Sequence, residues 1–147
     1  MNESLKLENQ LCFRLYTASR LITQAYHPLL GRWGLTYPQY LVLMVLWEED
    51  DQKVNDIARR LFLETNTVTP LLKRMEASSL LSRGRNSSGD ARQVIVSLTD
   101  KGRALQGELK NVPEAIGSAV MCNSISAETA PMLYKMLDDM IDKLSRE

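Results

Sequence analysis

Two cysteines are the residues of this sequence that could carry redox chemistry. Cys12 lies in LENQLCFRLYTASR, residues 7–20, an amphipathic helical pattern in which leucine or alanine would pack as well and could not be oxidised. Cys122 lies far along the chain, in VMCNSIS. The stretch MNESLKLENQ lacks the basic-then-apolar order of a signal peptide, so we expect a cytoplasmic protein with reduced thiols. In that compartment an isolated pair is typical of buried, catalytic or redox-sensing cysteines rather than of a structural disulfide.

The middle of the chain carries an excess of positive charge. Residues 53–92 contain eight basic and four acidic side chains, a net charge of +4, and because the whole chain has a formal net charge of zero the remainder carries −4. A positive segment between acidic ends indicates a polyanion-binding part mounted on a scaffold. The basic members of the segment are Lys53, Arg59, Arg60, Lys73, Arg74, Arg83, Arg85 and Arg92.

The apolar spacing predicts that mostly helices position these residues. One long helix is expected over residues 5–30, and a nearly all-apolar, buried helix is expected in TYPQYLVLMVLWEE, residues 36–49. Two shorter helices are expected in KVNDIARRLFLETNTVTPLLKRMEASSLL, residues 53–81, joined by a tight turn at FLE. Two strand-like runs follow, LSRGR and RQVIVSL, separated by the loop-forming cluster NSSGDA. This order predicts a β-hairpin with a polar tip.

The C-terminal third returns to helical patterns. Thr99 is the expected N-cap of a helix through LTDKGRALQGEL, Pro113 should kink or end that helix, and Ser126 is the candidate N-cap of a last amphipathic helix. With 147 residues, of which 44% are hydrophobic and 24% charged, the composition fits one soluble globular domain. No apolar run approaches the roughly 20 residues that span a membrane. The expected fold class is mainly α with a small β-hairpin wing.

Helix, short turn, helix and then a hairpin with a basic, glycine-containing tip is the order of a winged helix-turn-helix, here over residues 36–98. The second helix begins with ETNTVT, whose hydroxyl and amide groups can reach bases or phosphates. Pro70 breaks a helical rule past the first turn, which is more expected at a functional site than in a structural helix. Arg92 follows the tip and could enter a minor groove, braced by Asp90. The candidate DNA-binding residues are Thr65, Asn66, Thr67, Thr69, Pro70, Lys73, Arg74, Arg83, Arg85, Asp90 and Arg92; alternatively, these charges merely solvate a hairpin.

The chain resembles the MarR family of bacterial transcription regulators, and within it the organic hydroperoxide sensors. The segments LENQLCF, LTYPQYLVLMVLWE, TVTPLLKRMEASSLL and DAR followed by VIVSLT look like those of the sensors in order and spacing, over nearly the whole length. The resemblance implies a DNA-binding repressor that forms a homodimer through helices at about 4–30 and 100–146. Each subunit then offers a recognition helix to a major groove and a wing to a minor groove of an inverted-repeat operator. Asn66, where a small residue is common, and a slightly longer hairpin tip prevent transfer of an operator sequence.

The resemblance also implies roles for one cysteine and three tyrosines. Cys12 corresponds to the peroxide-reactive cysteine, and Tyr16, Tyr26 and Tyr37 correspond to tyrosines that surround it. Tyr16 lies four residues after Cys12, on the same face of a helix. Tyr26 lies 14 residues away, about 21 Å along an unbroken helix, so it could reach only the thiol of a second subunit. Neutral hydroxyl donors stabilise a thiolate, which attacks a peroxide oxygen and becomes a sulfenic acid.

Cys122 decides which kind of sensor the resemblance implies. Members with a second cysteine near this place resolve the sulfenic acid as a disulfide, whereas one-cysteine members depend on an external small thiol. Our hypothesis is a two-cysteine sensor with organic hydroperoxide as the inducer, in which Cys122 resolves within or, by preference, between subunits. The alternative for Cys122 is a small apolar core residue, because free cysteines are often buried and inert.

Two other functions compete with a hydroperoxide-sensing repressor. The first is a MarR-type repressor released by a reversible small hydrophobic or phenolic ligand, with incidental cysteines. The second is a thiol peroxidase, which usually needs a thioredoxin-like βαβ order that this mostly helical pattern lacks. We predict no enzyme activity, cofactor or metal site, because His27 is the sole histidine and the sequence shows no glycine-rich phosphate loop or Ser–His–acid order.

Overall fold

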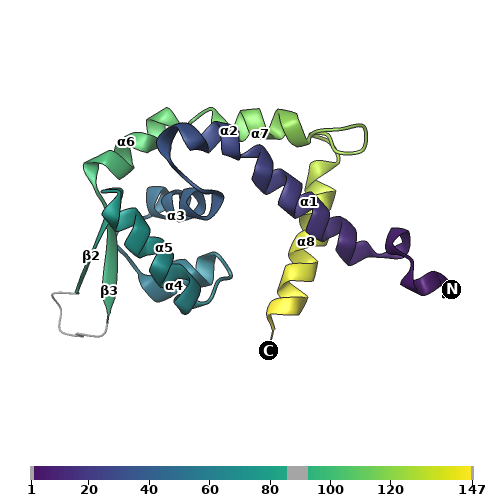
Figure 1. The fold of residues 1–147 in the computed structure, drawn as a ribbon, viewed down its shortest axis with the longest axis horizontal. Coiled ribbons are helices and arrows are strands. Elements are labelled where there is room, and N and C mark those ends of the chain that lie inside the picture. Colours follow the sequence, from purple (N-terminus) through teal and green to yellow (C-terminus); the bar gives the residue numbers. More distant parts are fainter. Residues whose placement is uncertain (1, 86–92, 147) are drawn as a thin grey trace. The chain divides into compact units, whose positions relative to one another are not determined.

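The computed structural model describes residues 2–85 and 93–146 of the chain. The predicted DNA-binding positions Asp90 and Arg92 lie outside these residues. The chain divides into two compact units, residues 1–37 and 38–147. Figure 1 labels most of their helices and strands. Within the described ranges, no helix is both long enough and apolar enough to cross a membrane.

The N-terminal unit holds two short 3-10 turns, η1 (Glu3–Leu5) and η2 (Leu7–Asn9), followed by α1 (Leu11–Ala25), α2 (His27–Leu30) and η3 (Gly31–Trp33). The single helix expected over residues 5–30 is therefore interrupted at both ends. At the start, amide side chains bond to backbone carbonyls in place of a helix: Asn9 donates to the Glu3 oxygen and Gln10 to the Ser4 oxygen, each at 2.7 Å. At the end, Pro28 lacks a backbone N–H, which the first turn of a helix does not need, so it stands in the first turn of α2 rather than inside α1.

The remaining helices belong to the second unit, apart from the first residue of α3. They are α3 (Tyr37–Glu48), α4 (Val54–Arg60), α5 (Thr65–Ala77), α6 (Asp100–Glu108), α7 (Val112–Val120) and α8 (Ala130–Ser145). The α4–α5 pair is joined by the predicted tight turn, in which Phe62 adopts a positive φ of 55°. The core of this unit includes side chains that are at most 1% exposed: Val42, Leu43, Leu46, Ile57, Val68, Leu72, Met75, Leu81 and Val96.

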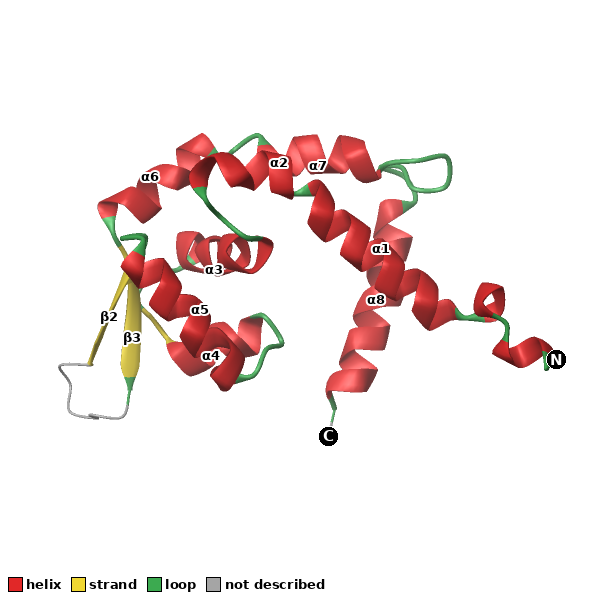
Figure 2. Ribbon diagram, viewed as in Figure 1, coloured by secondary structure: helices red, strands yellow, loops and turns green. Residues whose placement is uncertain are grey.

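Three short strands form an antiparallel sheet with the order β1–β3–β2 (Figure 2). β2 (Leu81–Arg85) and β3 (Val94–Leu98) are the predicted hairpin, in register from Leu81 opposite Leu98 to Arg85 opposite Val94; we call these two strands and the residues between them the wing. β1 (Gln52–Lys53) is not among the predicted elements and pairs Gln52 with Val96. The predicted fold class, mainly helical with a small winged helix-turn-helix sheet, is confirmed.

Of the three helix boundaries predicted in the C-terminal third, two are confirmed and one is wrong. Thr99 does cap α6, because its Oγ1 accepts the Gly102 N–H at 3.1 Å. The break near Pro113 is also present, with α6 ending at Glu108 and Pro113 in the first turn of α7. Ser126 as the cap of the last helix is wrong, because α8 begins at Ala130 after Thr129. The Thr129 Oγ1 accepts the Ser126 N–H at 2.9 Å, so Ser126 belongs to the turn that precedes the helix.

A single glycine allows α6 to approach the base of the wing. A Cβ at Gly102 would lie 2.1 Å from the Leu80 backbone oxygen and 3.1 Å from the Leu98 Cδ2. The indole Nε1–H of Trp47, in α3, donates to the Gly102 oxygen at 3.0 Å. α3, α6 and the wing are therefore held together at a point where only glycine fits.

Candidate nucleic-acid interface and thiol sites

Helix α5 has one buried and one exposed face. It begins after Glu64, whose carbonyl oxygen accepts the N–H groups of Thr67 at 3.0 Å and Val68 at 3.1 Å. Its apolar positions Val68, Leu71, Leu72 and Met75 are buried. Of the predicted DNA-binding residues on this helix, Thr69 is half-buried and the others are exposed: Thr65, Asn66, Thr67, Pro70, Lys73 and Arg74.

Polar groups on the exposed face of α5 differ in what they bind. The Thr69 Oγ1 donates to the Thr65 oxygen at 2.9 Å, and the Thr65 Oγ1 donates to the Asn55 Oδ1 at 3.2 Å. Pro70 stands inside the helix and has no N–H to offer the Asn66 carbonyl, although the helix continues to Ala77. The first two turns of α5 therefore present small polar side chains beside a carbonyl that lacks its usual donor four residues along the helix.

A groove of about 370 Å³ runs between α5, the start of α4 and the wing. It brings together three of the predicted DNA-binding residues, Thr65, Thr69 and Arg83. It also contains residues that sequence analysis did not select for this site: Lys53, Val54, Asn55, Asp56, Arg59, Gln93 and Val94. Lys53 and Arg59 belong to the basic excess of the middle segment, and that excess is the one sequence signal that points to them.

Arg83 connects the wing to the end of α5. Its backbone N–H donates to the Glu76 Oε2 at 2.8 Å, and its guanidinium NH2 group donates to the Glu76 Oε1 at 3.2 Å. The hydrogen bond from the Arg83 backbone N–H, together with that from its guanidinium, lowers the pKa of the Glu76 carboxyl below its ordinary value. Arg85, at the end of β2, is exposed.

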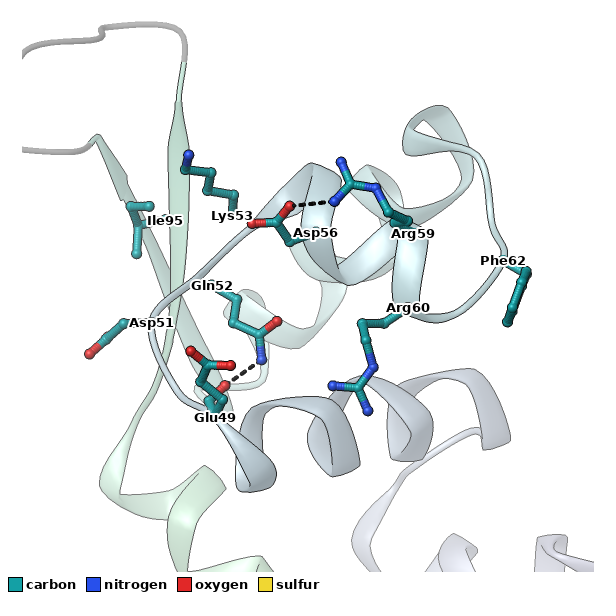
Figure 3. Close-up of a pocket in the computed structure, with 9 residues that line it drawn as sticks. All are labelled: Glu49, Asp51, Gln52, Lys53, Asp56, Arg59, Arg60, Phe62 and Ile95. Atoms are coloured by element: carbon teal, nitrogen blue, oxygen red, sulfur yellow. Dashed lines mark hydrogen bonds and ion pairs between the residues drawn. The ribbon is translucent and has the colours of Figure 1, made fainter.

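A second hollow, of about 570 Å³, lies beside α4, the α3–β1 connection and β3 (Figure 3). Figure 3 shows the Arg59 guanidinium against the Asp56 carboxylate, where Arg59 NH1 and Asp56 Oδ1 are 3.1 Å apart. Arg60 is paired with Glu48 at 2.8 Å. The hollow is lined by three carboxylates and three cations, whereas the groove beside α5 is lined by one carboxylate and three cations, so the hollow offers a polyanion less than that groove. The lining residues are Glu49, Asp51, Gln52, Lys53, Asp56, Arg59, Arg60, Phe62 and Ile95.

The predicted redox-active cysteine lies at the second position of α1. Cys12 is exposed, and so is Tyr16, one turn further along the same helix. Tyr26 and Tyr37 lie together, with ring centroids 4.5 Å apart and ring planes tilted by 51°. Since Tyr26 follows the last residue of α1, this tyrosine pair is about 21 Å along the helix axis from Cys12 of the same chain.

The second cysteine lies in the connection between α7 and α8. Cys122 is exposed. Its backbone forms a closed turn with Ile125, in which the Cys122 N–H donates to the Ile125 oxygen at 3.1 Å and the Ile125 N–H donates to the Cys122 oxygen at 3.2 Å. Neither thiol is in the core of its own chain, so both are open to reagents or to a partner.

Comparison with known proteins assigns the chain to a family. Residues 24–109, more than half of the chain, match the family of the transcriptional regulators SarA and Rot. The chain is 40% identical over 142 residues to the organic hydroperoxide resistance transcriptional regulator of Bacillus subtilis (strain 168), covering 96% of each chain. The chain belongs to the SarA/Rot-type MarR family of transcriptional regulators. The family predicted from the sequence segments is thereby confirmed.

Two further relatives of this SarA/Rot-type regulator extend the comparison. It is 51% identical over 111 residues to the transcriptional regulator TtmR of Methylorubrum extorquens, and spans 56% of that protein. AbfR of Staphylococcus epidermidis, solved in its reduced form bound to DNA, matches with 40% identity and a TM-score of 0.78, covering 99% of this chain and all of AbfR. A disulfide-formed AbfR structure matches with 41% identity and a TM-score of 0.68, covering 98% of this chain and 96% of AbfR.

Proposed function

We propose that this regulator is a homodimeric DNA-binding repressor that senses organic hydroperoxides through Cys12 and then releases its operator. The observation that carries the proposal is the exposure of Cys12 on α1, an amphipathic helix without a single buried side chain. An exposed thiol on a helix whose apolar face is uncovered in the single chain suits a sensor at a subunit interface. The relatives support this assignment, because one is an organic hydroperoxide resistance regulator and another is known in reduced and disulfide-formed states.

The proposed DNA-binding surface consists of the exposed face of α5, the groove beside it and the wing. Asn66 and Thr67 suit base edges in a major groove, whereas Lys73, Arg74 and Arg85 suit phosphates. Reduced AbfR bound to DNA supports DNA as the partner. A twofold dimer predicts inverted half-sites with centres about 34 Å apart, one helical turn of DNA. Asp90 and Arg92, at the predicted wing tip, complete the proposed surface with Thr65, Thr69, Pro70 and Arg83.

The terminal helices supply the proposed dimer interface. Large apolar side chains of α1, and separately of α8, are exposed in the single chain, and exposed apolar side chains gathered on one helix mark an interaction site. On α1 they are Leu11, Phe13, Tyr16, Leu21 and Ile22. On α8 they are Met132, Tyr134, Met136, Ile141 and Leu144. A second copy of the chain is the partner that the family relationship favours.

A dimer also explains how the three tyrosines could serve one thiol. Tyr16 can approach Cys12 of its own chain, whereas the Tyr26–Tyr37 pair lies too far along α1 to do so. In the proposed dimer, the pair of one subunit approaches the Cys12 of the other. Their phenol groups would then donate hydrogen bonds to the thiolate, and any change at the sulfur would alter the spacing of the two DNA-binding surfaces.

The proposed chemistry has two balanced steps. The Cys12 thiolate takes the terminal oxygen of the hydroperoxide, whose O–O bond breaks, so that the sulfur becomes a sulfenic acid and the organic product leaves as an alcohol after taking up a proton. The Cys122 thiol then attacks the sulfenic sulfur, forming a disulfide and releasing water. The disulfide-formed AbfR structure supports a two-cysteine route in this family.

An operator-binding assay with reduced and peroxide-treated protein tests the sensor. Reduced protein should bind a duplex that it has itself selected from a random-sequence library, and one equivalent of cumene hydroperoxide should release it. Cys12→Ser should bind the same duplex and no longer respond, because it lacks the nucleophile. Cys122→Ser should form the sulfenic acid without the disulfide, which mass spectrometry of the peptides distinguishes.

Three observations would contradict different parts of the proposal. A peroxide response that survives in Cys12→Ser would rule out the thiol mechanism. Release of wild-type protein by a phenolic ligand, with no effect of peroxide, would favour a reversible-ligand repressor. Catalytic turnover of peroxide with a dithiol would point to a peroxidase.

A further inference from the structure

We propose that Glu76 and Arg83 form a clamp that fixes the direction of the wing relative to α5, so that both residues support DNA binding by positioning rather than by contact. This inference rests on the proposed DNA-binding function and deepens it. Glu76 lies in the last turn of α5, and Arg83 lies at the middle of β2. The clamp therefore joins the proposed recognition helix to the proposed wing across seven residues of chain.

The geometry of the clamp is that of a fixed two-point attachment. One carboxylate oxygen of Glu76 accepts the backbone N–H of Arg83 at 2.8 Å, and the other accepts a guanidinium N–H of the same residue at 3.2 Å. A bond to the backbone holds the strand itself, which a bond between two side-chain tips would not do. Arg83 is opposite Val96 in the ladder, so holding Arg83 also holds β3.

The burial of Arg83 favours positioning over contact with a phosphate. Its side chain is only 21% exposed, and within the described residues its Nε is buried without a hydrogen-bond partner. By contrast, Lys73, Arg74 and Arg85 are exposed cations of the kind that reach phosphates. Arg83 thus forms a wall of the groove beside α5, with one of its donors already bonded to Glu76.

The negative charge of Glu76 distinguishes a positioning role from a purely electrostatic role. A carboxylate three residues after Lys73, on a helix that binds DNA, repels phosphates. If charge were its only contribution, removing that charge would tighten DNA binding. If Glu76 positions the wing, removing the charge weakens DNA binding, because the wing contacts are lost. The two interpretations therefore predict changes of opposite sign.

The test compares Glu76→Gln with Glu114→Gln, a matched control that removes one negative charge from α7 and leaves the clamp intact. The probe is the duplex selected by the wild-type protein from a random-sequence library. We expect Glu76→Gln to bind it roughly fivefold more weakly, the lower end of the loss of a groove contact, and Glu114→Gln to bind equally or slightly more tightly. Hydroxyl-radical footprints should lose the outer protections assigned to the wing and keep the central ones. Tighter binding by Glu76→Gln would overturn the proposal.

A double substitution separates positioning from direct contact. If Arg83 acts only through the clamp, Glu76→Gln combined with Arg83→Gln should bind the duplex no more weakly than the worse single variant, and all three should show the same salt dependence. Additive losses, with a shallower salt dependence for Arg83→Gln alone, would show that Arg83 contacts a phosphate and overturn the positioning role.

A measurement without DNA keeps this inference distinct from the proposed function. Amide hydrogen exchange should be faster at Arg83 in Glu76→Ala, which removes both acceptor oxygens, than in the wild type, and unchanged in α6, while Glu114→Ala should leave Arg83 as it is. If the wild-type protein selects no duplex at all, DNA binding fails as the function, whereas the exchange result still reports on the clamp. Unchanged exchange at Arg83 would show that Glu76 does not hold the wing.

Discussion

Helix α5 and the terminal helices α1 and α8 all have amphipathic sequences, but they bury their apolar faces to very different extents. Val68, Leu72 and Met75 of α5 are completely buried within one chain. α1 has no buried residue, and Ala130 is the sole buried residue of α8. The winged helix-turn-helix is therefore complete within a single chain, whereas the terminal helices are not.

This difference shows what an amphipathic pattern can and cannot specify. Periodicity indicates that one face of a helix must be covered, but it does not indicate which segment or chain covers that face. For α5 the cover is supplied by the same chain. For α1 and α8 we propose that a second chain supplies it, which also places the exposed Cys12 at the interface.

The largest expected effect separates the two kinds of helix by the concentration dependence of stability. Leu72→Ala, in α5, removes a fully buried side chain and should cost about 3 kcal/mol at any protein concentration. Leu11→Ala, in α1, removes a side chain that is 61% exposed in the single chain. Its cost should be largest in dilute protein and shrink as the concentration rises, because the dimer is what it weakens.

Urea unfolding at several protein concentrations, together with sedimentation of the native protein, provides the measurement for both variants. A Leu11→Ala variant that sediments like the wild type and unfolds at the same urea concentration throughout would mean that α1 is not part of a dimer interface. A concentration-dependent loss in Leu72→Ala would mean that the winged helix-turn-helix is not complete in one chain.

The next effect concerns two glycines of the same helix. Gly102→Ala places a Cβ 2.1 Å from the Leu80 backbone oxygen, which cannot move without displacing the base of the wing. We expect a loss of about 2 kcal/mol in the free energy of unfolding. Gly107→Ala meets no atom within 4 Å and should stabilise α6 by about 0.5–1 kcal/mol. Equal changes in the thermal midpoints of the two variants would contradict the close approach of α6 to the wing.

Much of the fold could be predicted from the sequence because long periodic segments and strong turn clusters specify it. The buried helix α3, the α4–α5 pair and the β2–β3 hairpin all follow from such local signals. The strand β1 could not, because two residues carry no period and pair only through a distant partner, β3. The 3-10 turns before α1 depend on side-chain hydrogen bonds such as that from Gln10 to the Ser4 oxygen. Hydrophobic periodicity does not predict such bonds.

The sequence predicts individual residues of the candidate site better than it predicts the surface that they form. Hydroxyl and amide groups at the start of α5 and exposed cations further along it are visible in the sequence. The groove that joins Thr65 to Arg83 is not, since it depends on how the wing folds back beside α4. Likewise, the pairing of Glu76 with Arg83 requires a turn whose direction is known only from the structure.

A smaller effect tests the cap that connects the wing to α6. Thr99 accepts the Gly102 N–H at 3.1 Å and donates to the Ser79 oxygen at 2.6 Å. Thr99→Ala removes both bonds and should lower the free energy of unfolding by about 1 kcal/mol, whereas Thr99→Ser should retain most of the stability. Urea unfolding of the two variants measures the difference. Equal losses in both would assign the effect to the methyl group rather than to the cap.

The smallest expected effect is a pH dependence at the clamp. Because Arg83 holds the pKa of the Glu76 carboxyl below its ordinary value of 4.5, the carboxylate contributes stability above that value. The contribution is lost as the pH falls through the lowered pKa, where the folded protein also takes up the proton. Glu76→Gln should therefore be less stable than the wild type at neutral pH, and the difference should disappear as the pH falls below 4.5. In an Arg83→Gln background the same substitution should show a weaker dependence on pH, since that background lacks the guanidinium; an undiminished dependence would assign the effect to the Arg83 backbone N–H alone.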